Sequence, residues 1–120
     1  MVRNVDEKIV TVEHAQGGEG SIEFHHLMTG DELLGHARLF AKVVIKPHSS
    51  IGMHKHVDET EPYFIIKGEG VFVDNDGTRT TVRPGDVCLI DPGQSHSIEN
   101  NTDEELWMVA IVLYDKGINK

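Results

Sequence analysis

The chain has 120 residues, of which 20 are Asp or Glu and 11 are Lys or Arg, so its formal net charge is −9 with histidine counted as neutral. This length fits one domain that buries about two-thirds of its unfolded surface, so folding alone requires no metal or disulfide. The acidic balance disfavours nucleic acid and anionic membranes as partners, because both are bound through clustered Lys and Arg. The eight histidines are more than packing requires.

The single cysteine and the apolar runs exclude further classes of protein. A chain with a single cysteine, Cys88, has neither a disulfide framework nor a cysteine-based zinc site. The position of Cys88 in the apolar run 87–90 predicts a buried structural thiol. Residues 1–8 lack the apolar core of a signal peptide. The longest apolar run, 106–114, is too short for a transmembrane helix of about 20 residues. We therefore expect a soluble, cytoplasmic protein.

Short apolar runs separated by glycine, proline and aspartate predict a series of β-strands. We expect strands at residues 9–12, 21–27, 37–46, 63–66, 71–73, 78–82, 87–90, 95–99 and 106–114. One helical turn is expected after Thr29, because Glu32 follows in the capping-box arrangement. A hairpin turn is expected at 74–77, where Asp precedes Gly. Many strands with few helices favour an antiparallel sandwich or barrel.

Two of these strands carry information about what covers them. The strand 106–114 is apolar on both faces, so one face should meet the barrel interior and the other a second layer, the N-terminal arm or another subunit. This pattern predicts a homodimer. In the strand 37–46, Arg38 and Lys42 alternate with an apolar face, and we expect both to point outward. If they pointed inward, they would be able to hold an acidic substrate.

The histidine spacing indicates a metal site. His54 and His56 are separated by one residue, so in a strand both side chains point to the same face. Glu61 has the opposite parity, and a turn or bulge within 57–60 must bring it to that face. With His96, these residues would offer three imidazoles and one carboxylate, a set suited to Mn, Fe, Co, Ni, Cu or Zn. From spacing alone, a metal site and two solvent-facing histidines in a loop remain open.

Two segments resemble the conserved motifs of the cupin family. The pattern His54-x-His56-x4-Glu61-x6-Gly68 resembles the first motif. The run 85–100, with Pro92-Gly93, His96 and Asn100 at the expected spacing, resembles the second, and 16 residues separate Gly68 from Gly85. The chain departs from the family pattern at two positions. His48 replaces the usual opening Gly and must adopt the dihedrals of a turn, and Asp91 replaces the usual Pro.

The resemblance implies an all-β fold, the double-stranded β-helix or jelly roll, which is a barrel of two antiparallel sheets. It implies a single cupin domain over 1–120, with 1–36 as an N-terminal arm and 37–114 as the barrel core. It further implies one divalent transition metal ion held deep in one end of the barrel. The four positions that match the family's ligands are His54, His56, Glu61 and His96.

The same resemblance bounds the function. Small cupins of this form are often described as oxalate-decarboxylase-like, which implies a small-molecule metalloenzyme of the decarboxylase, dioxygenase or isomerase type. The alternative is a non-catalytic module that binds or senses a small metabolite. Tyr63, Ile65 and Ile98 share the inward parity of the ligands, so we expect them to line the pocket. Asn100 matches the residue that closes the second motif and supports its turn.

Glu59 is the candidate catalytic residue, because a second carboxylate near the metal can shuttle protons or replace Glu61 as a ligand. The competing interpretation, a solvated acid at the rim, is favoured by the frequency of surface acids. Together with Asp58 and Glu61, Glu59 should attract cations to this loop and hinder the entry of an anionic substrate. The remaining histidines are expected at the surface or in an interface: His14, His25, His26, His36 and His48.

Overall fold

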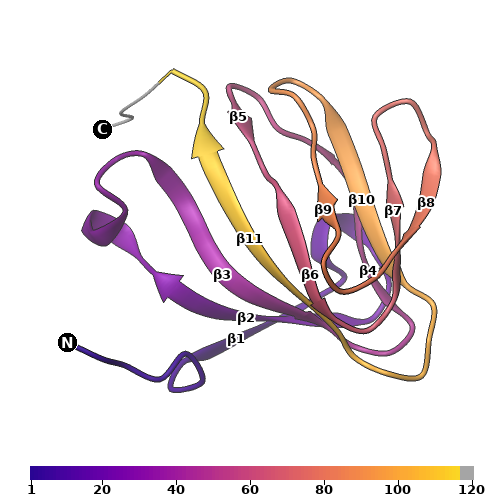
Figure 1. Cartoon of the computed structure of the whole chain (residues 1–120), viewed down its shortest axis with the longest axis horizontal. Helices are drawn as coiled ribbons and strands as arrows, with labels where there is room; N and C mark the ends of the chain where they lie inside the picture. The colour runs from indigo at the N-terminus through magenta and orange to yellow at the C-terminus, as the bar shows by residue number, and fades with distance from the viewer. Residues whose placement is uncertain (117–120) are drawn as a thin grey trace.

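The computed structural model describes residues 1–116 as strands joined by turns, with two short 3₁₀ turns (Figure 1). The last four residues of the predicted domain, 117–120, lie outside the described part. The strands are β1 (Ile9–Glu13), β2 (Ser21–Met28), β3 (Ala37–Ile45), β4 (Ser49–Lys55), β5 (Glu59–Thr60), β6 (Tyr63–Lys67), β7 (Gly70–Val73), β8 (Arg79–Val82), β9 (Val87–Cys88), β10 (Ser95–Asn100) and β11 (Leu106–Tyr114). The 3₁₀ turns are η1 (Ala15–Gly17) and η2 (Gly30–Leu33).

The strands form two antiparallel sheets that face each other (Figure 1). The larger sheet has the order β1-β2-β3-β11-β6-β9, with β5 paired to the end of β11, and the smaller has the order β4-β10-β7-β8. The N-terminal segment thus contributes β1 and β2 to the larger sheet. The expected all-β fold, a double-stranded β-helix of two antiparallel sheets, is confirmed. Within residues 1–116, no helix is long and apolar enough to cross a membrane.

The core lies between the sheets and is built by alternation. On β11, Leu106, Met108 and Ala110 point inward and are fully buried. They belong to one cluster with Ile98 and Phe72 of the smaller sheet. Cys88 also lies in this cluster, and burial raises the pKa of its thiol to about 11, which confirms the predicted buried thiol.

Nine strands form where the sequence predicts them, but β4 and β5 were not expected. Residues 49–53 of β4 include two serines and a glycine and lack alternation, so their pairing with β10 gives the strand its form. The turn η1 packs across β4, where Gly52 leaves room for the carbonyl of Gln16; a Cβ on Gly52 would collide with that oxygen. His48 has φ 54°, the left-handed turn conformation expected of the residue replacing glycine.

Two β-bulges break the alternation where it bears on the barrel interior. In β3, Leu39 pairs with Val112 and Ala37 pairs with Leu113, so Arg38 is the extra residue. In β4, His54 pairs with His96 and Ile51 pairs with Ile98, leaving two residues opposite Ser97. The β4 bulge turns His54 toward the interior, and the β3 bulge releases Arg38 from the strict alternation of its strand.

Asn100 joins the strand ends at the base of the barrel and has no exposed surface. Its amide nitrogen donates to the carbonyl oxygens of Ile45, Lys46 and Glu104 at 2.7–3.1 Å. Its oxygen accepts from the backbone N–H and the hydroxyl of Thr102. The expectation that this residue supports the turn is confirmed.

Replacing Asn100 with Ala is expected to lower the free energy of unfolding by about 2–4 kcal/mol, because buried polar groups left without partners cost about 1–3 kcal/mol each. Urea unfolding followed by circular dichroism measures this change. The control is Asn101→Ala at the neighbouring exposed position, where a change within about 0.5 kcal/mol is expected. Equal unfolding midpoints for the two variants would contradict the role given to Asn100.

Candidate metal centre

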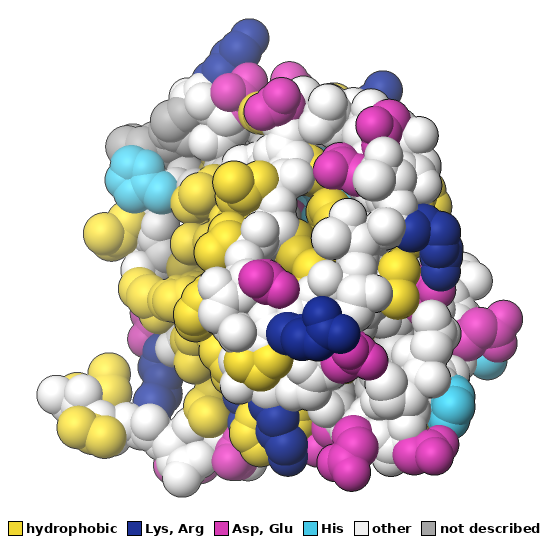
Figure 2. Space-filling view, turned by 45° about the vertical axis from the view of Figure 1, so that its right-hand side comes forward, with side chains coloured by type: hydrophobic (Ala, Val, Ile, Leu, Met, Phe, Trp, Pro, Cys, Tyr) yellow, Lys and Arg dark blue, Asp and Glu magenta, His cyan; other side chains and the backbone are white. Residues whose placement is uncertain are grey.

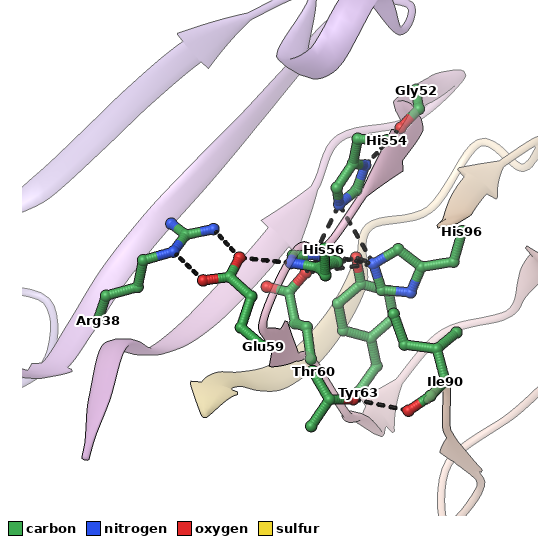
Figure 3. Close-up of polar contacts among 10 residues, drawn as sticks. Arg38, Gly52, His54, His56, Glu59, Thr60, Tyr63, Ile90 and His96 are labelled. Atoms are coloured by element: carbon green, nitrogen blue, oxygen red, sulfur yellow. Dashed lines mark hydrogen bonds and ion pairs between the residues drawn. The ribbon is translucent and has the colours of Figure 1, made fainter. Parts of the chain in front are cut away.

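Three imidazoles and one carboxylate meet inside the barrel (Figure 3). His54 comes from β4, His56 follows the end of β4, Glu61 lies between β5 and β6, and His96 comes from β10. One ligand atom from each residue lies within 4.8 Å of the others, and His96 is completely buried. The structure therefore brings together all four residues that the motifs predicted.

Strand pairing and two backbone features set this arrangement. His54 lies directly opposite His96 across the β4–β10 pair. The backbone of His56 bonds to the turn of the second motif, donating to the Gln94 carbonyl and accepting from the Gly93 N–H. Asp58 has φ 59°, and this left-handed residue supplies the turn expected within 57–60 that redirects Glu61 inward.

The hydrogen bonds behind two of the rings fix which nitrogen faces the cluster. His54 Nδ1 lies 2.7 Å from the Gly52 carbonyl oxygen, and His56 Nδ1 lies 2.8 Å from Glu59 Oε1. Both partners are acceptors, so each Nδ1 carries a proton, and in the neutral form of either ring the lone pair of Nε2 faces the cluster. His96 Nδ1 has no partner among the described residues.

The atoms that face one another at the centre are mainly acceptors. His96 Nε2 lies 3.1 Å from His56 Nε2 and 3.2 Å from His54 Nε2, and Glu61 Oε1 lies 3.1–3.7 Å from all three nitrogens. Such lone pairs repel unless a cation or proton stands between them. The donor set therefore fits a divalent transition metal ion, with three imidazole nitrogens and one carboxylate oxygen as ligands.

Tyr63 adds one donor beside the cluster. Its hydroxyl donates to Glu61 Oε1 at 3.2 Å and lies 3.2 Å from His96 Nε2, while its ring stacks on the His96 ring at 4.8 Å. Burial, with the nearby Glu61 charge, raises the pKa of Tyr63 well above its ordinary value. The phenol therefore stays protonated and able to donate.

Charge in the cluster is concentrated on Glu61. Burial alone would raise its pKa, but contacts with His54, His56 and His96 hold the pKa far below its usual range. Burial lowers the pKa of His96 despite its contact with Glu61. For His56, burial is outweighed by its bonds to Glu61 and Glu59, so its pKa is raised.

Glu59 and Arg38 lie together in a different setting from the one expected. Glu59 is buried, with 9% of its surface exposed, so the interpretation of a solvated rim acid was wrong. Its carboxylate binds Arg38 at 2.6 and 2.8 Å and also accepts from His56. Arg38 lines the pocket although 51% of its side chain is exposed, because the β3 bulge at this residue breaks the alternation that would have pointed it away from the interior. Lys42 does point outward, over the ring of Trp107.

A pocket of about 200 Å³ opens beside the cluster. Tyr63 lines it as expected, whereas Ile65 and Ile98 lie deeper, fully buried in the core, and do not line it. Most of its wall is apolar, and much of that wall comes from the N-terminal segment. Its lining residues before β3 are Val12, Ala15, Gln16, Ile22 and Phe24.

The other histidines do not join the cluster. His14, His36 and His48 are exposed and His26 is half-buried, in agreement with the expected surface positions. His25 is buried on the outer side of β2, with its two ring nitrogens 2.7 Å from Asp6 and 3.1 Å from Glu23. No local signal distinguished His25, because Asp6 reaches it only through the path of the N-terminal segment.

Comparisons with known proteins agree with this geometry. The family model described as "Cupin domain" matches residues 41–112. An "Oxalate-binding protein" of Thermotoga maritima is 44% identical over 115 residues, which is 94% of each chain. A crystal structure from the same organism, described as a predicted oxalate decarboxylase, superimposes with a TM-score of 0.90 at 41% identity, covering 95% of this chain and 99% of that one.

A more distant solved structure has the same fold. A cupin 2 conserved barrel domain protein from Salinispora arenicola matches with a TM-score of 0.65 and 29% identity, covering 77% of this chain and 75% of that one. The two sequence motifs, the two facing sheets, the four converging ligand atoms and these matches lead to one conclusion: the chain belongs to the cupin family.

Proposed function

We propose that this protein binds one divalent transition metal ion through His54, His56, Glu61 and His96, and that the ion and the adjoining pocket together hold a small carboxylate. The observation that carries the proposal is the convergence of three Nε2 atoms on a buried carboxylate oxygen. Such an ion supplies Lewis acidity toward a carboxylate or carbonyl oxygen and, for a redox-active metal, activation of dioxygen.

The pocket supports an anionic ligand. Arg38 is the one Lys or Arg among the described residues that line it. Its Nε and Nη2 bind Glu59, and its Nη1 forms no hydrogen bond within the described residues, so Nη1 is free to meet a ligand. The same ion pair neutralises Glu59, which weakens the expected repulsion of anions by the acidic loop. The name of the oxalate-binding relative supports the same class of ligand.

Binding is the primary proposal and turnover the second. Both oxygens of Glu59 are engaged by Arg38 and His56, which argues against proton shuttling by this side chain. Tyr63, whose hydroxyl lies beside Glu61 and His96, is the hydrogen-bond donor that supports a metal-dependent decarboxylase, dioxygenase or isomerase as the alternative. The exclusion of nucleic acid and membrane partners, and a cytoplasmic location, stay predictions from composition.

A homodimer is proposed from the apolar outer face, which we define as the outward residues Phe64, Ile66, Val87 and Leu113 of the larger sheet together with Leu89, which follows β9. Each has at least 36% of its surface exposed. Phe64 pairs with Val87 on one side and with the half-buried Val109 on the other, so the apolar surface is continuous across three strands. Figure 2 shows hydrophobic side chains gathered on the face in view. A second copy would cover this face.

The metal site predicts the composition of the purified protein. Elemental analysis of the protein isolated without added metal should find near one equivalent per chain, and His96→Ala should lose most of it, because the buried ring supplies one of the four ligands. His48→Ala should keep full occupancy, because it removes an exposed ring whose one hydrogen-bond partner among residues 1–116 is Asp103. Full occupancy in His96→Ala would contradict the assignment.

The pocket predicts metal-dependent carboxylate binding. Titration calorimetry with oxalate should detect saturable binding to the zinc-loaded protein and little to the metal-free protein. At saturating zinc, Arg38→Gln should weaken oxalate binding by about 10–100-fold, because charged hydrogen bonds contribute about 1.5–3 kcal/mol. Lys55→Gln, at an exposed position outside the pocket, should leave it unchanged. Equal oxalate binding with and without metal would exclude the proposal of metal-dependent binding. Release of CO₂ or consumption of O₂ by the manganese-loaded or iron-loaded protein would favour the alternative, a metal-dependent enzyme.

The apolar outer face predicts a concentration-dependent dimer. Sedimentation equilibrium should give twice the 13.4 kDa chain mass for the wild type and the chain mass for Phe64→Glu, because a buried unpaired charge opposes association. Thr80→Glu, which adds the same charge on the exposed part of β8, should remain dimeric. A wild-type protein that stays monomeric at all concentrations would remove the proposal.

A further inference from the structure

Glu59 joins the pocket to one metal ligand. Its Oε1 accepts hydrogen bonds from His56 Nδ1 at 2.8 Å and from Arg38 Nη2 at 2.6 Å, and its Oε2 accepts from Arg38 Nε at 2.8 Å (Figure 3). The carboxylate is therefore held in one orientation by a two-point contact with the guanidinium before it meets the imidazole. An exposed carboxylate would sample several orientations; this buried one does not.

The three imidazoles of the cluster differ in what holds them from behind. His56 has an ionised carboxylate at Nδ1, His54 has the neutral carbonyl of Gly52, and His96 Nδ1 has no partner within the described residues. A carboxylate that accepts the distal N–H of a metal-ligating histidine fixes its tautomer and makes the ring a stronger donor to the metal. Among the three, only His56 meets that description.

The fold supplies this contact from three neighbouring strands. Glu59 lies in β5, where it pairs with Tyr114 of β11, and Arg38 lies in β3 on the other side of β11. The bulge at Arg38 releases its side chain from the alternation of β3, so the guanidinium reaches across the end of β11 to Glu59. The position of Arg38 is thus built into the sheet.

We infer that Glu59, fixed by Arg38, is the positioning residue for His56. It holds the proton on Nδ1, aims Nε2 at the metal and strengthens this ring as a ligand. The inference rests on the proposed metal binding and assigns Glu59 a role that is neither metal ligand nor proton shuttle. Arg38 then has two roles, since it orients Glu59 through Nε and Nη2 while Nη1 is available to the pocket.

The first test compares zinc affinities, measured by competition with a chelator of known affinity. Glu59→Ala is expected to weaken zinc binding by about 10–100-fold, the range found for partners of metal-ligating histidines. Arg38→Gln should weaken it in the same direction by a smaller factor, because Glu59 remains but loses its orientation. Asp58→Asn is the matched control, since it removes the same charge from the exposed residue directly before Glu59. Asn also adopts the left-handed backbone conformation of Asp58, so the turn is kept and the zinc affinity should stay within about twofold.

The second test has a readout that general destabilisation would not reproduce. In the zinc-loaded protein labelled with ¹⁵N-histidine, the Nδ1–H protons of His54 and His56 should both be observed, because both are hydrogen-bonded and shielded from water. In Glu59→Ala, the His56 proton signal should broaden or vanish through exchange with water, while the His54 signal persists. His54 thus serves as an internal control in the same sample.

The outcomes separate this inference from the proposed function. If the wild type does not bind zinc, the metal site itself is wrong. If the wild type binds zinc but Glu59→Ala stays within about threefold of Asp58→Asn and keeps the His56 signal, the positioning role is overturned and the metal site stands. If Glu59→Ala does not fold, Glu59→Gln decides through its zinc affinity alone. Its amide still offers an oxygen to His56 but places a donor against Arg38, so weaker zinc binding is again expected.

Discussion

The constraint on which the site depends is the close approach of four hydrogen-bond acceptor atoms, from His54, His56, Glu61 and His96, inside the barrel. Three ring nitrogens and one carboxylate oxygen lie within 4.8 Å of one another, and among the described residues only Tyr63 provides a hydroxyl donor beside them. The free energy of this arrangement is unfavourable unless positive charge stands at the centre. Each side chain must then be held in place by its surroundings, and strand pairing, a bulge and backbone bonds to the second motif's turn accomplish this.

Much of the fold is readable from the sequence because most strands bury one face. The strand 106–114 forms where it was expected, and its inward residues 106, 108, 110 and 112 are at most 1% exposed. β4 was missed because residues 49–53 have little intrinsic preference for a strand and gain their form from β10 and from η1. β5 has only two residues, too few to carry a pattern.

The candidate metal ligands were predicted because the spacing of the two motifs can be recognised in the sequence without knowledge of side-chain packing. The surroundings of the ligands were not, because they depend on register. Arg38 follows the alternation of β3 in the sequence, and only the pairing of that strand with β11 shows that it is the extra residue of a bulge. Glu59 likewise reads as a surface acid until its guanidinium partner is placed. Ile65 and Ile98 face inward as expected, but they lie in the core and do not line the pocket. The alternation of residues along a strand predicts which face a side chain takes, and it does not predict how deep in the barrel that side chain lies.

The wall of the pocket has an origin distinct from that of the ligands. All four candidate metal-ligating residues fall within the segment 41–112 that matches the family. The pocket-lining residues Val12, Gln16 and Phe24 come from the chain before that segment. A related barrel that resembles this chain only over the matched segment would have the four candidate metal-ligating residues but not the pocket wall formed by the N-terminal segment. The candidate metal-ligating residues and this part of the pocket wall thus come from separable stretches of sequence, so the N-terminal segment can change the shape of the pocket while the four candidate metal-ligating residues stay the same.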